Sequence, residues 1–175
     1  MTSRDHVAVL LYALDQRYDP VPEHVVRLAL ADIAGSGFDP AARDELPASL
    51  AGEPWRGRTL AAGEQAPFAE ASYFEHVLLR GEWPDDTTLA AYLRSLRDVL
   101  LDAASGVFIA RFNGADRIGA VRRSGAQRGG RGGDWIVVAY DPALRHWVAG
   151  WQPKDGLAAI AGGDWSDVSW LRMPR

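Results

Sequence analysis

The chain has 175 residues, and its content of 47% hydrophobic and 24% charged residues is typical of a packed globular protein. It contains no cysteine, which excludes disulfide bonds, thiolate metal ligands and a cysteine nucleophile. The net charge of −4 is unevenly spread: residues 1–105 carry nine Arg against seventeen Asp and Glu (−8), whereas residues 106–175 carry ten Lys and Arg against six Asp (+4). The C-terminal part is therefore the candidate for a polyanionic partner, unless its basic surface is simply balanced by the acidic part.

Two amphipathic helices are predicted near the N-terminus. Ser3 is a capping residue for a helix that runs to about Tyr18, because apolar residues follow it at helical spacing. Pro22 suits the first position of a second helix, which ends at Gly35. The apolar run of the first helix is too short to span a membrane, and no small-residue cleavage site follows it. We therefore expect a helix rather than a signal peptide, no membrane partner and a cytoplasmic location.

Residues 38–66 are rich in Pro, Gly and Ala and have no clear period, which is typical of a loop or linker. This composition places a boundary near residue 66. We expect an N-terminal helical extension and loop over residues 1–66, and an α+β domain over residues 67–175.

Helical periodicity becomes clearer after Pro67. A helix is predicted up to Arg80, where Gly81 stops it, and Asp86 or Thr87 can cap the next helix. That next helix has a continuous apolar stripe, formed by Leu89, Tyr92, Leu93, Leu96, Val99 and Leu100.

The pattern then becomes alternating, which predicts strands. Asn113 and Gly114 are a strong signal for a tight hairpin between the first two strands. The expected strands cover residues 106–112, 116–124, 134–141 and 146–152, a short helix covers 155–160, and a last strand is suggested at 168–174. The fold class that follows is α+β: N-terminal helices, then a four- to five-stranded antiparallel meander sheet with helices packed on one face.

The connection after the second strand, SGAQRGGRGGD, is rich in Gly and Arg. Five arginines and no acidic residue lie between positions 117 and 131, and mobile guanidinium groups can bind phosphates as a fork. The sequence therefore predicts RNA contacts here, although solvated connectors often have the same composition. The candidate RNA-binding residues are Arg117, Arg122, Arg123, Arg128 and Arg131.

The order of motifs over residues 74–163 resembles a known family. An EH pair opens a helix, TTLAAYLRSLRDVLLD forms the next one, and GVFIARFNG and VVAYDPALRHWVAGWQPKDGLAAIAGG follow. This order is similar to the tRNA-cleaving nuclease domain of colicin D and its relatives among bacterial polymorphic toxins. The resemblance implies a small ribonuclease fold, metal-free cleavage in a tRNA anticodon loop, and a tightly binding immunity or antitoxin protein as partner.

The resemblance also implies site residues. The family's catalytic His corresponds to His76, and the Trp of its Ser-Gly-Trp strand corresponds to Trp151. Its Tyr-Arg-Gly hairpin corresponds to residues 112–114, with Arg111 beside them. Two positions depart from the family, since its Lys before the His is Glu75 here and its Ser is Ala149. Glu75 repels RNA where the family's Lys holds phosphate, so arginines of the hairpin loop are expected to supply the cations if catalysis is retained.

The residues themselves support a metal-free ribonuclease. Cleavage of this kind needs a proton acceptor for the 2′-OH, a proton donor for the leaving oxygen, and cations around the phosphate. Histidine has an ordinary pKa that suits either proton role near neutral pH. Arg111, Arg122 and Arg123 are expected to share one side of the sheet, and Trp151 can stack a splayed base. The predicted catalytic residues are His76, Arg111 and Trp151, with no metal and no cofactor.

A non-catalytic reading stays open. Glu75, Ala149 and the overall acidity favour an immunity- or antitoxin-like protein-interaction module on a related fold. His76 is then an ordinary helix residue, and Trp147 and Trp151, which alternate with Ala149 and are expected to share one face, are core residues.

Overall fold

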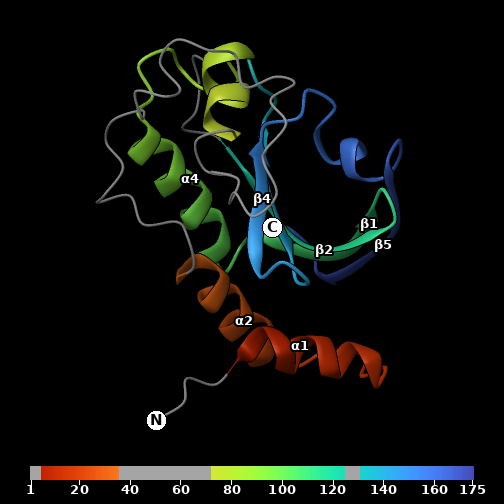
Figure 1. The fold of residues 1–175 in the computed structure, drawn as a ribbon. Coiled ribbons are helices and arrows are strands. Elements are labelled where there is room, and N and C mark those ends of the chain that lie inside the picture. The colour runs from red at the N-terminus through yellow and green to blue at the C-terminus, as the bar shows by residue number, and fades with distance from the viewer. Residues whose placement is uncertain (1–4, 36–71, 125–130) are drawn as a thin grey trace, which may run out of the picture.

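The computed structural model describes residues 5–35, 72–124 and 131–175, which form helices and one antiparallel sheet (Figure 1). This architecture confirms the predicted α+β class. The helices are α1 (His6–Asp15), α2 (Glu23–Gly35), the π-helix η2 (Phe74–Leu79), α4 (Leu89–Leu101) and the 3-10 helix η3 (Gly156–Ile160). The strands are β1 (Gly106–Phe112), β2 (Ala115–Arg123), β3 (Trp135–Asp141), β4 (His146–Trp151) and β5 (Trp165–Arg172).

The sheet has the strand order β4-β3-β2-β1-β5, with every neighbouring pair antiparallel. Strands β1 to β4 form the predicted meander, and the first hairpin turns at Asn113 and Gly114, whose φ angles are 48° and 79°. These positive values are why an Asn-Gly pair favours this turn. Strand β5 does not continue the meander, because it crosses the sheet and pairs with β1 at the opposite edge.

The sheet is curved so strongly that its two edges approach each other on one face. The rings of Trp151 in β4 and Trp165 in β5 lie with their centroids 6.0 Å apart, although three strands separate β4 from β5. Figure 1 shows β1, β2 and β5 bending away from the line of β4. The side chains of Trp151 and Trp165 therefore stand on the concave face of a half-open barrel.

Two clusters of buried side chains lie on the two faces of the sheet. On the convex face, α4 packs against β2 and β3, and α1 and α2 contribute to the same cluster. Gly150 permits the close approach of α4 to β4, since a Cβ added there meets Leu96 Cδ1 at 2.4 Å. On the concave face, Ile160 of η3 packs with Phe108, Val121 and Val137. The prediction that the helices share one face is thus not confirmed, because the crossover from β4 to β5 carries η3 over the concave side.

Helices α1 and α4 begin as the capping rules require, but at different residues from those predicted. Asp5 caps α1 by accepting a hydrogen bond from the Ala8 N–H, and Thr88 caps α4 in place of Asp86 or Thr87. Ser3 and residues 38–66 lie outside the described residues, so the boundary near residue 66 stays a prediction. The described helices include none with the length and hydropathy that crossing a membrane requires.

The outer edge of β4 is covered by side chains from the segment that precedes β1. The Gly150 N–H donates to Ser72 Oγ at 3.3 Å, and Tyr92 Oη donates to the Gly150 carbonyl at 2.7 Å. Ser72 Oγ and Tyr92 Oη lie 2.6 Å apart, which closes a buried hydrogen-bonded ring. Because backbone groups on an edge strand are otherwise open to pairing with another chain, this ring both protects the edge and fixes η2 and α4 against the sheet.

Replacing Tyr92 by Phe is expected to lower the free energy of unfolding by about 1–2 kcal/mol, since it removes the donor to the Gly150 carbonyl from a buried ring. Burial raises the pKa of Tyr92 above its ordinary value of 10.0. Above pH 10 the unfolded chain therefore loses this proton first, and the stability contributed by Tyr92 falls by about 1.4 kcal/mol per pH unit. Urea unfolding of both proteins between pH 8 and 11 measures the two effects.

The matched control for that experiment is Tyr12→Phe, because Tyr12 is 64% exposed. We expect it to leave the free energy of unfolding at pH 8 unchanged. Tyr73 and Tyr140, whose pKa values burial also raises, keep part of the alkaline dependence in every variant. If Tyr92→Phe is as stable as the original protein at pH 8, the hydrogen-bonded ring of Ser72, Tyr92 and Gly150 does not contribute to stability as proposed.

Candidate functional site

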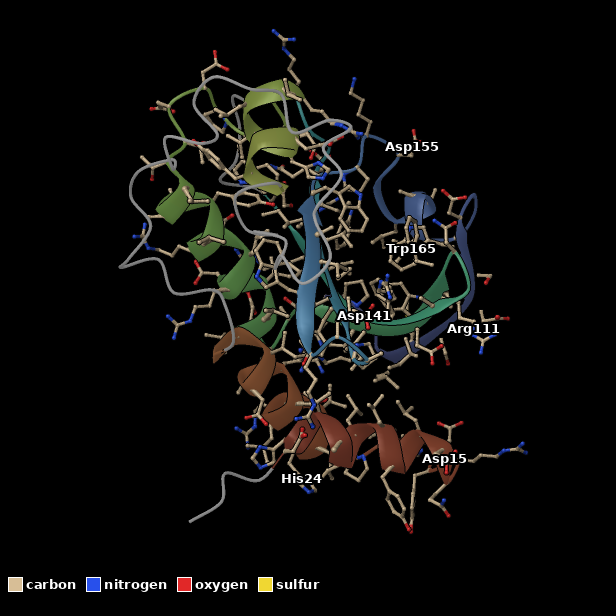
Figure 2. The ribbon with its side chains drawn as sticks, viewed as in Figure 1. Asp15, His24, Arg111, Asp141, Asp155 and Trp165 are labelled. Carbon is tan, nitrogen blue, oxygen red and sulfur yellow. The ribbon has the colours of Figure 1, made fainter. Side chains whose placement is uncertain are left out.

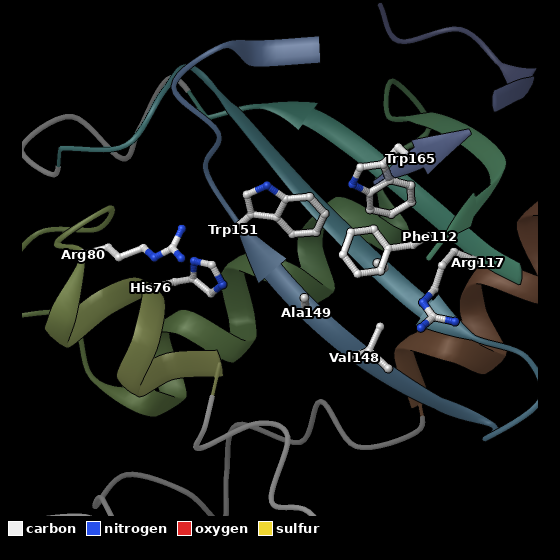
Figure 3. A pocket seen from close by; sticks show the side chains of 9 residues that line it. His76, Arg80, Phe112, Arg117, Val148, Ala149, Trp151 and Trp165 are labelled. Carbon is white, nitrogen blue, oxygen red and sulfur yellow. The ribbon is translucent and has the colours of Figure 1, made fainter. Parts of the chain in front are cut away.

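A cavity of about 330 Å³ opens on the concave face of the sheet, between η2, β4 and the start of β5 (Figure 3). His76 and Arg80 lie at one end of it and Arg117 at the other, with aromatic rings between them. It therefore brings together three of the predicted site residues, His76, Trp151 and Arg117. The residues that line it are His76, Arg80, Phe112, Arg117, Ala139, Val148, Ala149, Trp151 and Trp165.

His76 is paired with a carboxylate that the sequence pattern did not single out. Its Nδ1 donates to Glu82 Oε1 at 3.1 Å, and the two side chains are only 14% and 9% exposed. A carboxylate can only accept here, so it places the proton of a neutral imidazole on Nδ1. The other nitrogen, Nε2, is then left with a lone pair, which is the arrangement of a positioned proton acceptor.

The local backbone explains how Glu82 reaches His76. The segment Phe74–Leu79 is a π-helix, a form that occurs frequently at functional sites. Gly81 follows with a φ of 60°, and this left-handed residue reverses the chain so that the Glu82 N–H donates to the His76 carbonyl at 2.9 Å. The histidine and the carboxylate are thus joined through both backbone and side chains.

Glu82 is also fixed to the sheet by a buried network. Its second oxygen, Oε2, accepts the Gln152 N–H at 2.8 Å, and the Gln152 amide donates to the Glu82 carbonyl at 3.0 Å. Ser124 Oγ in turn donates to Gln152 Oε1 at 3.0 Å. Because every carboxylate oxygen has a donor, the orientation of Glu82, and through it that of His76, is set by the end of β4.

Trp151 and Trp165 form an aromatic wall beside the histidine. Their rings are inclined by only 23°, and the centroid of Trp151 lies 6.5 Å from that of His76. Phe112 packs on Trp165 with its centroid 5.0 Å away. The wall is half-buried, so planar ring surface is available from the cavity. Such surfaces stack nucleobases.

The prediction that Trp147 and Trp151 share one face is wrong. Ala139 pairs with Ala149 but Tyr140 pairs with Trp147, so Val148 is an extra residue in β4. A bulge of this kind shifts the alternation by one residue. Trp147 is consequently buried against the helices, while Trp151 faces the cavity.

The structure does not bring Arg111 or Arg122 to the cavity. Arg111 alternates with Phe112, points outward at the rim and pairs with Asp116 (Figure 2). Arg122 lies on the helix side near the other end of β2, where its Nη1 donates to Asp102 at 3.2 Å. Backbone and side-chain hydrogen bonds to Ala104 and Arg122 lower the pKa of Asp102, in that order.

The remaining arginines of the predicted RNA-binding set are spread out. Arg123 is on the cavity side of β2 but at its far end, where its guanidinium lies 5.8 Å from the centre of the Trp135 ring. The Arg131 N–H donates to the Gly81 carbonyl, directly after η2. Arg128 lies outside the described residues. Arg122 and Arg123 are neighbours in a strand and face opposite sides, so the expected common face of Arg111, Arg122 and Arg123 does not exist.

The two arginines that do line the cavity differ in how firmly they are held. Arg80 pairs with Glu75 at 2.7 Å and is 51% exposed. Arg117 pairs with Asp141 at 2.8 Å, and both side chains are nearly buried, at 13% and 9% exposure. An exposed ion pair contributes about 0–1 kcal/mol, so Arg80 can exchange its partner at little cost. The pair of Arg117 is fixed by burial and costs far more to break.

Sequence reasoning missed Glu82, Arg80 and Trp165 as site residues. Arg80 was visible as a cation one turn after His76 on the predicted helix. Glu82 follows the helix stop, and no periodicity rule connects it to His76. Trp165 lies at the site only because β5 crosses the sheet to pair with β1, and no local pattern in the sequence predicts this crossing.

The chain was compared with protein-family models, with curated proteins and with solved structures. None of the three comparisons found a match. The colicin D resemblance therefore remains an expectation from sequence. Over residues 5–35, 72–124 and 131–175, there is no group of three His, Asp or Glu side chains that could hold a metal ion.

Proposed function

We propose that the chain is a metal-independent endoribonuclease that acts on single-stranded regions of RNA, tRNA first among them. The observation that supports this most is the His76–Glu82 pair, which presents an imidazole nitrogen beside an aromatic wall at the mouth of the cavity. We further propose, from the colicin D resemblance, that the protein is a toxin. Its partner is then an immunity or antitoxin protein.

In the proposed reaction, His76 Nε2 takes the proton of a ribose 2′-OH, and the 2′-oxygen attacks the adjacent phosphorus. The bond from phosphorus to the 5′-oxygen breaks, and that oxygen takes a proton from a water molecule. The hydroxide left behind receives the proton that His76 had taken, which restores the neutral imidazole. The products are a 2′,3′-cyclic phosphate and a 5′-hydroxyl end. Glu82 holds the proton on Nδ1 and stabilises the imidazolium that forms.

Arg80 is the proposed phosphate ligand. It lines the cavity at the His76 end, and its exposed pairing with Glu75 is weak enough for a phosphate to replace the carboxylate. Glu75 stands where the resembling family has a Lys, so Arg80 supplies the missing positive charge from one turn further along. Ala149 lines the cavity where that family has a Ser, which leaves His76 as the proposed proton acceptor.

One observation favours the non-catalytic alternative. Both cavity arginines are already paired with acidic residues, Arg80 with Glu75 and Arg117 with Asp141, which lowers their attraction for a phosphate. In that case the concave face binds a protein partner, and no RNA is cut.

Cleavage of bacterial tRNA in EDTA separates the two proposals. The full chain is expected to give discrete fragments with cyclic phosphate ends, and His76→Ala is expected to lower the rate by at least about 10²-fold. The control is His24→Ala, an exposed histidine on α2, which should leave the rate unchanged. Intact tRNA with folded protein, or equal cleavage by His76→Ala, overturns the nuclease proposal.

A further inference from the structure

We infer that the Arg117 end of the cavity is a base-recognition site and that it selects guanine. This inference rests on the proposed function, because it names the nucleotide that the nuclease holds in its cavity. It uses three features that the proton-transfer argument leaves unused: the free edge of Arg117, its pairing with Asp141, and the aromatic rings of Trp165 and Phe112.

The guanidinium of Arg117 has a free hydrogen-bonding edge. Both of its hydrogen bonds, to Asp141 Oδ2 at 2.8 Å and to the Asp116 carbonyl at 2.9 Å, come from Nη1. Within the described part of the chain, Nε and Nη2 donate to no other group. These two nitrogens lie on the edge of the guanidinium that forms a side-on fork, so two parallel donors remain for a ligand.

The charge state of the pair favours a neutral ligand over a phosphate. Asp141 compensates the positive charge of Arg117, and the Ala143 and Leu144 N–H groups donate to its other oxygen. The carboxylate is thus tied into the turn after β3 and cannot move away to release a bare cation. A fork of donors without net charge is suited to two adjacent neutral acceptors.

Guanine presents such acceptors in O6 and N7, and an arginine fork on this edge is the commonest specific contact to a base. Adenine has a donor in place of O6. Cytosine offers O2 and N3, but on a single ring. The aromatic wall of Phe112, Trp151 and Trp165 runs between the two ends of the cavity (Figure 3), and a two-ring base covers more of it. Among the four bases, guanine alone offers both the two adjacent acceptors for the Arg117 donors and a two-ring surface to stack on the aromatic wall.

The placement agrees with the proposed chemistry. His76 and Arg80 are at the opposite end of the cavity from Arg117. A base held at Arg117 and stacked on the wall directs its ribose and 3′-phosphate towards the histidine. Cleavage on the 3′ side of guanine is the consequence.

The test is calorimetric titration of the full chain with the 3′-monophosphates of guanosine, adenosine, cytidine and uridine. We expect the guanosine nucleotide to bind about tenfold more tightly than each of the others. Arg117→Lys keeps a cation for Asp141 but has no fork, so it should lose the preference. Arg123→Lys, on the same side of β2 but outside the cavity lining, is the matched control and should keep it.

Equal affinities for the four nucleotides, tighter binding of the cytidine nucleotide, or no binding at all overturns the inference, whatever the behaviour of Arg117→Lys. The result is separate from that of the cleavage assay, because binding is measured on a product-like nucleotide that cannot be cut. Guanosine preference without tRNA cleavage keeps the recognition site and rejects the nuclease. Cleavage of tRNA without a preference for the guanosine nucleotide keeps the nuclease proposal and rejects the recognition site.

Discussion

Glu82→Gln is expected to lower the rate of RNA cleavage by about two to four orders of magnitude while the fold is kept. Glu82 accepts from two donors, His76 Nδ1 and the Gln152 N–H, but an amide has only one oxygen. If that oxygen keeps the backbone N–H, the amide nitrogen faces His76 and donates to Nδ1. The proton of the imidazole then moves to Nε2, and the proton acceptor is lost.

The measurement has a kinetic and a spectroscopic part. Single-turnover cleavage gives the rate, and nitrogen-15 NMR of the histidine ring gives the tautomer, which should change from Nδ1–H to Nε2–H. The control is Glu23→Gln, an exposed carboxylate on α2 that pairs with Arg172. If Glu82→Gln cleaves RNA at the original rate, Glu82 has no positioning role. If the rate falls with the tautomer unchanged, its effect is structural.

Gly119→Ala is expected to destabilise the protein by about 3 kcal/mol, at the upper end of the usual cost of overpacking. A Cβ at this position in β2 meets Phe108 Cζ at 2.1 Å, and Phe108 is completely buried. The ring cannot move aside, because Trp165 and Trp170 pack on it with centroids 5.9 and 5.6 Å away. Any shift of Phe108 is therefore passed on to Trp165 and the cavity wall.

Urea unfolding measures this loss, and nucleotide titration measures the effect on the cavity. Gly162→Ala is the matched control, since a Cβ there has no atom within 4 Å, and it should change stability by no more than about 0.5 kcal/mol. A Gly119→Ala protein of unchanged stability would show that the concave core accommodates an extra methyl group. It would also show that Phe108 does not support Trp165 as described.

Local signals in the sequence were sufficient for most of the elements. The strand β1 has the predicted bounds, and the Asn113-Gly114 turn lies where the dipeptide placed it. The apolar stripe of α4 is buried as its helical spacing required. The caps were less secure, because Ser, Thr and Asp stand close together at both helix starts and only the backbone geometry selects among them.

The candidate site was predictable only in part. His76, Trp151 and Arg117 were named from sequence and do line one cavity, whereas Arg111 and Arg122 were named and do not. The error was in the face: Arg111 and Arg122 alternate with Phe112 and Val121, which lie on the concave side, so both arginines stand on the other side of the sheet. The β4 bulge is why the prediction that Trp147 and Trp151 share a face was wrong. One extra residue in the strand moves a side chain to the other face, and the sequence pattern does not show where the bulge lies.

By itself, the sequence determined the helices, the strands, the first hairpin and the amphipathic faces that pack into a core, since these depend on spacing within about a turn or a strand. Three features depend on the tertiary structure: the edge of the sheet that β5 joins, the face on which Trp151 lies, and the hydrogen bond between Glu82 and His76. These depend on sheet curvature, on a bulge and on one left-handed glycine, whose consequences appear only when distant segments pack. The cavity exists because β5, Trp151 and the His76–Glu82 pair are brought together in this way.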